Sequence, residues 1–238
     1  MYYVCSDIHG NWEKFVSLLR EIQLKPEDTL FVLGDIIDRN PYGIKILRHL
    51  MKMKNAKLLR GNHEEMMLEA LGTSGEISAI DNDAMDLWVK RNGGDITLNY
   101  LKHIRKDLRR EILTFLADLP LEYRVTVGNK QFILVHAAPP SLYSDTHPRY
   151  KIYGSKEEFS VWYRLHYYDQ ISEGTVVFGH TPTYRYQEAD PLRIYYGDNK
   201  IIGIDCGAGL PSQDSPFFRV NGRLGCLRLD DMQEFYSE

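Results

Sequence analysis

The stretch LFVLGDIIDR (residues 30–39) joins an apolar run to two carboxylates and an arginine. Short runs rich in β-branched and aromatic residues are typical of buried strands, so we predict a strand that ends just before Asp35. Carboxylate oxygens are hard ligands that suit divalent cations near a phosphate. The stretch therefore predicts a strand with a metal ligand at its carboxyl end.

Four further stretches repeat this pattern of an apolar run followed by a potential ligand. They are YYVCSDIHG (residues 2–10), AKLLRGNHE (56–64), FILVH (132–136) and TVVFGHT (175–181). Asp7 and Asp35 are 28 positions apart, and Asp35 and Asn62 are 27 apart, which is about the length of a strand–helix–strand unit. Open α/β sheets bring the carboxyl ends of their strands to one crevice. We therefore expect an α/β fold that gathers these side chains.

The donor atoms of the five motifs are carboxylate and amide oxygens and imidazole nitrogens, without a thiolate. This set suits manganese, iron, zinc or magnesium and not a soft metal or an iron–sulfur cluster. We predict two divalent ions, with manganese as the first expectation and iron, zinc or magnesium as alternatives. The predicted reaction is hydrolysis of a phosphate ester at a two-metal centre.

Together the motifs resemble those of the calcineurin-like metallophosphoesterases, in their bacterial phosphoprotein-phosphatase branch. The segments that match are SDIHG (6–10), GDIIDR (34–39), GNHE (61–64), the strand-end His136 and GHT (179–181), and the resemblance covers roughly residues 1–210. It implies a metallophosphoesterase-type β-sandwich flanked by helices, with the site at the carboxyl ends of the strands. The metal ligands implied by the resemblance are Asp7, His9, Asp35, Asn62, His136 and His180, with Asp35 bridging both ions.

The resemblance also implies roles for residues beside the ligands. His63 resembles the general acid that protonates the leaving oxygen, and Asp38 the carboxylate that orients this histidine and raises its pKa. Arg39 and Arg60 are expected to bind phosphate oxygens, and Arg164 resembles a third arginine of the family. One departure is Asn40, which stands where the family has glycine; asparagine tolerates a left-handed backbone, so we expect the turn to be kept.

Each of these residues also has an ordinary structural explanation. A single buried histidine is more often hydrogen-bonded than metal-bound, Asp38 could begin a helix, and Arg60 could be a surface charge. It is the convergence of the whole set on strand ends that favours a metal site. Asp205 follows a predicted strand but lies outside the ligand set, and we expect it to be structural. Glu64 is expected to support the ligands.

We expect residues 1–238 to form a single domain with two insertions, a helical one over about 72–118 and an aromatic lid over about 139–170. After His180, residues 193–196 and 201–204 are predicted to form one hairpin, and residues 217–220 and 224–229 another, together forming a separate sheet. A net charge of −4 and a pI near 6.1 argue against a generic nucleic-acid binder. Three unpaired cysteines and the lack of a signal segment or membrane-length apolar run favour the cytosol.

Three functions remain open at this level. The first is hydrolysis of phosphomonoesters, with phosphoserine and phosphothreonine in proteins as substrates. The second is hydrolysis of bis(5'-nucleosyl) tetraphosphates and related dinucleoside polyphosphates. The third is a metal-binding interaction protein without catalysis, and the presence of both Asp38 and His63 counts against it. The expected partner is thus a phosphorylated protein or a small phosphate ester.

Overall fold

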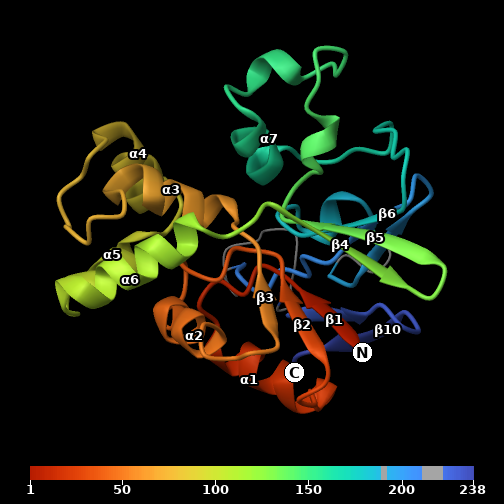
Figure 1. Cartoon of the computed structure of the whole chain (residues 1–238), viewed down its shortest axis with the longest axis horizontal. Coiled ribbons are helices and arrows are strands. Elements are labelled where there is room, and N and C mark those ends of the chain that lie inside the picture. The colour runs from red at the N-terminus through yellow and green to blue at the C-terminus, as the bar shows by residue number, and fades with distance from the viewer. Residues whose placement is uncertain (189–191, 211–221) are drawn as a thin grey trace.

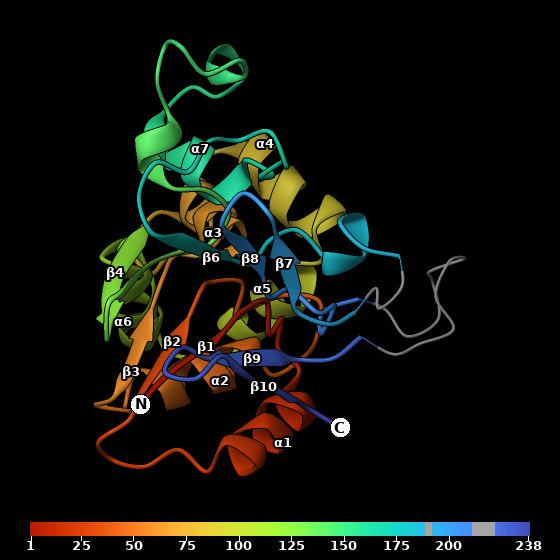
Figure 2. The same ribbon diagram turned by 90° about the vertical axis from the view of Figure 1, so that its right-hand side faces the viewer.

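Two five-stranded sheets form the centre of the protein in the computed structural model, which describes residues 1–188, 192–210 and 222–238. The first sheet runs in the order β10 (Gln233–Tyr236), β9 (Gly225–Arg228), β1 (Tyr2–Cys5), β2 (Thr29–Val32) and β3 (Ala56–Leu58). The second runs in the order β4 (Glu122–Val127), β5 (Lys130–Val135), β6 (Thr175–Phe178), β8 (Ile201–Gly203) and β7 (Tyr195–Gly197). The predicted α/β architecture with two sheets flanked by helices is confirmed (Figures 1 and 2).

The sheets pack face to face because their strands alternate apolar side chains between two sides. In β2, Phe31 points to a cluster shared with Phe132 and Leu134 of β5, whereas Leu30 and Val32 point to the opposite face. This period of two is the geometry of an extended strand. The cluster between the sheets is fully apolar, and it holds the two sets of strand ends in a constant relative position.

Helices cover the outer faces of both sheets. The seven α-helices that the described residues form are α1 (Trp12–Ile22), α2 (Gly43–Leu50), α3 (Asn62–Leu71), α4 (Asn82–Asp86), α5 (Asp95–Lys102), α6 (Lys106–Ala117) and α7 (Lys156–Trp162). In Figure 1, α4, α5 and α6 lie together at one side of the sheets, and α7 lies above the second sheet. Residues 72–118 and 139–170 therefore add their helices outside the sandwich.

Strand direction explains how distant residues meet. β1, β2 and β3 are parallel to one another, and so are β5, β6 and β8. The segments that follow these strands leave from the carboxyl edges, where α/β proteins place their sites. Asp7, Asp35 and Asn62 follow strands of the first sheet, and His136 and His180 follow strands of the second.

The expectation of a separate sheet after His180 is wrong. β8 pairs in parallel with β6, so β7 and β8 extend the second sheet. β9 pairs antiparallel with β1, with Cys226 opposite Cys5, and β10 pairs with β9 at the edge of the first sheet. Both pairings join residues far apart in sequence, which hairpin signals do not report. The predicted strand 217–220 lies outside the described residues.

Candidate active site

The backbone is unusual at the predicted site residues. Of the nine non-glycine residues with positive φ in the described part of the chain, six belong to the predicted site: Asp7, His9, Asp35, Asp38, Arg39 and His180, with φ between 45° and 70°. Such conformations are unfavourable for residues with a Cβ and cluster at functional sites. Asn40 itself is not left-handed, so the left-handed tolerance of asparagine is not needed there; its side-chain amide donates to the carbonyl of His9 at 2.9 Å.

Asp35 lies at the centre of the site. Its Oδ2 is 3.5 Å from His9 Nε2, and its Oδ1 is 3.5 Å from His136 Nε2. Two compact groups of potential metal donors share it, one with His9 and His63 and the other with His136 and His180. A carboxylate common to both groups is the arrangement that a bridging ligand requires.

Asn62 and Asp7 complete these two groups. Asn62 Oδ1 is 2.9 Å from both His136 Nε2 and His180 Nδ1. On the other side, Asp7 Oδ1 is 4.0 Å from His9 Nε2. The side chains of Asp7 and Asn62 are buried, so their oxygens face the other donors and not solvent.

The imidazole rings of His9, His136 and His180 each use one nitrogen to contact a backbone carbonyl, and this contact orients the ring. His9 Nδ1 is 3.1 Å from the carbonyl of Ile37, and His136 Nδ1 is 2.7 Å from the carbonyl of Leu33. His180 uses Nε2, which is 3.2 Å from the carbonyl of Trp162. A nitrogen that donates to a carbonyl leaves the other nitrogen of a neutral ring with its lone pair. Those lone pairs are directed at Asp35 and Asn62.

Burial and neighbouring charges shift the pKa values of the donor groups in opposite directions. Burial lowers the pKa values of His9, His136 and His180. Burial raises the pKa of the Asp35 carboxyl, but the surrounding imidazoles outweigh it and hold that pKa below its usual range. Burial and the nearby carboxylates of Asp205 and Asp35 raise the pKa of Asp7.

This donor set fits divalent metal ions. The rings of His136 and His180 donate to the carbonyls of Leu33 and Trp162. Their unprotonated nitrogens then face the Asn62 oxygen at 2.9 Å. Lone pairs that face one another repel, and a cation bound between them would remove this repulsion. Ligands held about 2.1 Å from one ion at right angles lie about 3 Å apart. Neutral imidazoles and oxygen donors suit manganese, iron, zinc or magnesium.

His63 lies beside the two groups and makes a short contact with Asp38. His63 Nδ1 is 2.7 Å from Asp38 Oδ2, and both side chains are buried. His63 Nε2 is 3.8 Å from Asp35 Oδ2 and 3.2 Å from Arg39 Nη2. Burial opposes the charged ring, yet Asp35 and Asp38 raise the pKa of His63. A buried histidine in contact with a carboxylate is a pair that can donate a proton.

Glu64 holds the loops that carry the ligands. Its carboxylate accepts from the backbone N–H groups of Asp35 and Ile36 at 2.9 Å and of Gly61 at 3.0 Å. One buried side chain thus joins the segment after β2 to the start of α3. Neither carboxylate oxygen is directed at the donor groups, so the contacts of Glu64 are those of a supporting residue.

A pocket of about 160 Å³ opens over the donor groups. Asp7, Asp35, Asn62 and His180 line it, and so do Arg39, Arg164 and Arg185. Arg164 donates through one nitrogen to the carbonyl of His180 and to Thr181 Oγ1, both at 3.1 Å, which fixes its guanidinium at the pocket. Guanidinium groups in such a pocket can bind an anion. 

Arg60 behaves differently from the expectation for a phosphate-binding residue. Its Nε is 3.1 Å from the carboxylate of Glu65, and its Nη1 donates to the carbonyl of Ala117 at 3.4 Å. Arg60 is not among the residues that line the pocket. In this structure Arg60 is thus paired with Glu65 of α3, and its phosphate-binding role stays a prediction.

Several pocket residues were missed from the sequence. Asn92 comes from the helical insertion, Tyr184 and Arg185 from the segment after His180, and Asp205 from the end of β8. The rule that ligands follow strands could have placed Asp205 in the pocket. Asp205 Oδ1 accepts a hydrogen bond from the backbone N–H of Gly207 at 2.9 Å. This contact is one that a structural residue makes, as we expect for Asp205. For Asn92 and Arg185 the sequence carries no comparable signal.

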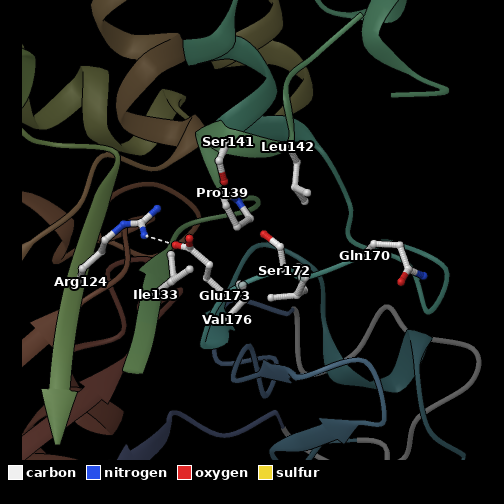
Figure 3. Close-up of a pocket in the computed structure, with 10 residues that line it drawn as sticks. Arg124, Ile133, Pro139, Ser141, Leu142, Gln170, Ser172, Glu173 and Val176 are labelled. Carbon is white, nitrogen blue, oxygen red and sulfur yellow. Dashed lines mark hydrogen bonds and ion pairs between the residues drawn. The ribbon is translucent and has the colours of Figure 1, made fainter. Parts of the chain in front are cut away.

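A second pocket, of about 190 Å³, shares no lining residue with the first (Figure 3). Its two charged residues, Arg124 and Glu173, form an ion pair at 3.2 Å. Ser141 comes from one segment and Gln170 and Ser172 from another, and their side chains do not converge on one position. It lacks the uncompensated positive charge and the donor groups that a phosphate site needs.

Comparison with known proteins gives the same class as the geometry. Residues 2–188 match the calcineurin-like phosphoesterase family, and the chain belongs to this family. Members of the family use a dinuclear divalent metal site, which the two groups around Asp35 could hold. The family membership that the motifs predict is confirmed, and this family indicates a metal-dependent hydrolase.

Individual relatives differ in what they act on. A segment of 68 residues is 32% identical to symmetrical bis(5'-nucleosyl)-tetraphosphatases from several Salmonella strains, but it covers 28% of this chain and only 24% of theirs. A candidate diadenosine tetraphosphatase has a similar structure, with a TM-score of 0.58, 22% identity, and coverage of 99% of this chain and 91% of that one. A serine/threonine phosphatase from Saccharomyces cerevisiae has a TM-score of 0.57 at 16% identity, covering 99% and 78%. At these identities the structures establish the fold.

The described residues include no helix long and apolar enough to cross a lipid bilayer.

Proposed function

We propose that this phosphoesterase hydrolyses phosphomonoesters of alcohols, with phosphoserine and phosphothreonine in proteins as the expected substrates. The observation that carries the proposal is the 2.7 Å contact between His63 and Asp38 beside the donor groups. An alkoxide is a poor leaving group, so its departure needs a proton from a positioned acid. A site with a built-in proton donor suits substrates of this kind.

In the proposed site, two divalent ions held by Asp35 and its neighbours would supply an activated water and neutralise the phosphate charge. The first ion would be held by Asp7, His9 and Asp35, and the second by Asp35, Asn62, His136 and His180. Manganese is the metal we expect. Asp7 and Asp35 are the two carboxylates of this ligand set, and the amide of Asn62 adds no charge, so two divalent ions would leave the centre positively charged, which favours a phosphate dianion.

The remaining residues orient the substrate and move the proton. Arg39 and Arg164 would each offer a guanidinium fork to the phosphate oxygens that face the pocket. His63 would give the proton on Nε2 to the leaving oxygen, and Asp38 would hold the ring through Nδ1. In the structure Arg39 Nη2 lies against His63 Nε2, so phosphate binding by Arg39 would also free that nitrogen.

A second candidate is hydrolysis of dinucleoside polyphosphates. Two observations favour it: the short match to symmetrical tetraphosphatases and Arg185, an additional cation lining the pocket. A chain of phosphates carries several negative charges, so it can use more cations than a monoester can. The same donor groups would serve either substrate, and the difference would lie at the mouth of the pocket.

A substrate panel separates the two candidates. Protein reconstituted with manganese would be assayed with a phosphoserine peptide, para-nitrophenyl phosphate and diadenosine tetraphosphate, and kcat/KM compared. The proposal expects the phosphopeptide to be at least as good a substrate as the dinucleotide. A kcat/KM for diadenosine tetraphosphate that is a hundredfold higher would assign the second function instead.

A further inference from the structure

The carboxylate of Asp38 is held from two sides. Its Oδ2 is 2.7 Å from His63 Nδ1 and also accepts the indole N–H of Trp88 at 2.8 Å. Asp38, His63 and Trp88 have no measurable solvent exposure. A buried indole N–H requires an acceptor, and here the acceptor is the oxygen that contacts the proposed acid.

Trp88 comes from the helical insertion and is held there by unusual backbone. It lies in a π-helical turn, Leu87–Arg91, which follows α4 directly. Single π-helical turns occur frequently at functional sites. The indole lies against Gly94, where a Cβ would stand 2.3 Å from the indole nitrogen. No side chain other than hydrogen fits at Gly94 without moving the ring.

The same insertion also binds the backbone next to the dyad. Thr97 Oγ1 accepts from the N–H of Asp38, and the carbonyl of Gly93 accepts from the N–H of Arg39, both at 3.1 Å. Asp38 and Arg39 are both left-handed, with φ of 70° and 65°. Their strained backbone is therefore stabilised by contacts from residues 88–97.

The indole acts on the carboxylate without taking part in proton transfer. Trp Nε1–H is a donor only, and it does not ionise. A second donor on Oδ2 limits rotation of the carboxylate and keeps that oxygen directed at the His63 ring. A tryptophan that served only to fill the core would need its volume and apolar faces, not its N–H.

We propose that Trp88 is a positioning residue of the reaction, which holds Asp38 so that His63 is aligned for proton donation. The helical insertion is then part of the catalytic apparatus and not only an addition to the fold. This inference rests on the proposed role of His63 as the acid. It goes beyond that role by assigning the alignment to a residue outside the family motifs.

Trp88→Phe tests the proposal because it removes the N–H and keeps an aromatic ring. The variant would be assayed on a phosphoserine peptide and on para-nitrophenyl phosphate, which differ in their need for an acid. We expect kcat on the phosphopeptide to fall about tenfold, because without this hydrogen bond the His63 ring is less well aligned for proton donation in the transition state. On para-nitrophenyl phosphate we expect a change within about twofold, with KM unchanged on both substrates.

Two controls make the result specific. Trp12→Phe makes the same change on α1, where the ring packs under the amine of Lys45, and should leave the ratio of the two rates as in wild type. In an Asp38→Asn background, Trp88→Phe should have no further effect on that ratio, because the two residues act in series. An equal loss on both substrates, or additive effects in the double variant, would make Trp88 structural and overturn the proposal.

A measurement on the unmutated tryptophan covers the case in which Trp88→Phe does not fold. In the nuclear magnetic resonance spectrum, the Trp88 indole N–H should resonate downfield and exchange slowly, and Asp38→Asn should move that signal selectively. An indole signal that Asp38→Asn leaves in place would contradict the contact. Lack of hydrolysis of every substrate by metal-loaded wild type would instead overturn the proposed function, and the role of Trp88 with it.

Discussion

The carboxylate of Asp7 accepts a hydrogen bond of 2.9 Å from the backbone N–H of His180, a residue 173 positions later in the chain. Asp7 follows the first strand of one sheet, and His180 follows a strand of the other. The contact therefore joins the carboxyl edges of the two sheets at the place where the donor groups meet. The site exists only when both sheets are formed and packed.

Metal removal should abolish the activity. Treatment with a chelator followed by gel filtration should leave protein without measurable hydrolysis of para-nitrophenyl phosphate. Manganese should restore activity at least as well as magnesium, because imidazole and amide ligands suit manganese better. Rates and metal content would be measured together on the same samples. Full activity of protein shown to contain no metal would end the two-metal account.

Asp35→Asn should be the most damaging single change among the ligands. It weakens the one carboxylate that belongs to both donor groups, so both ions should be lost. Elemental analysis after dialysis would give the metal content per chain. Asp7→Asn is the matched comparison, and it should weaken one ion more than the other. Two tightly bound ions in the Asp35→Asn protein would show that another residue bridges them.

His63→Asn should separate acid catalysis from binding. General acid catalysis contributes about 10²–10⁴-fold, so kcat on a phosphoserine peptide should fall by about a hundredfold or more. The loss on para-nitrophenyl phosphate should be much smaller, because nitrophenolate leaves without a proton, and KM should stay nearly constant. Asp38→Asn should follow the same pattern more mildly. Equal losses on both substrates would make His63 a binding residue.

Arg185→Gln should distinguish substrates by their number of phosphates. Burial and the nearby guanidinium of Arg185 lower the pKa of Arg164, so the two cations repel each other and an anion between them would relieve that repulsion. We expect KM for diadenosine tetraphosphate to rise about tenfold, with a smaller change for para-nitrophenyl phosphate. Arg20→Gln, an exposed change at the end of α1, is the control. The same KM change for both substrates would exclude a second phosphate position at Arg185.

Glu64→Gln should lower the free energy of unfolding. The carboxylate accepts from four backbone N–H groups, and an amide nitrogen in its place would face donors with a donor. The expected loss is about 2–4 kcal/mol, measured by urea denaturation. Glu65→Gln, whose carboxylate pairs with the partly exposed Arg60, should cost less than about 1 kcal/mol. Similar losses in the two variants would contradict the supporting role of Glu64.

The sequence predicts most of the local structure and less of the long-range pairing. The apolar runs before Asp7 and Asp35 identify β1 and β2, because buried strands have a strong local composition. β9 pairs with β1 in a register that places Cys226 opposite Cys5. This pairing joins residues far apart in sequence, so local sequence patterns do not predict it. Within the helical insertion predicted over about 72–118, α4 is followed directly by the π-helical turn that carries Trp88, a departure from the regular helical period that the sequence pattern does not indicate.

The predicted site follows the same division. Residues next to a strand end, such as His136, are placed by the strand itself and could be named from the sequence. Arg60 also follows a strand, but its side chain adopts a rotamer that pairs with Glu65. The sequence alone does not determine which rotamer a long side chain adopts. Trp88 comes from the helical insertion and Arg185 from the segment after His180, and their approach to the site depends on packing that no short motif describes.

The carbonyl of Trp162, at the end of α7, lies 3.2 Å from His180 Nε2. This contact has a consequence for protein engineering. The aromatic lid over about residues 139–170 could be exchanged between related enzymes to transfer substrate preference. Such an exchange would also remove the Trp162 carbonyl, which contacts His180, a candidate metal ligand. Chimeras of this kind should retain their metal only when the exchanged segment again presents a backbone acceptor at that position. The aromatic lid is thus not structurally independent of the donor groups.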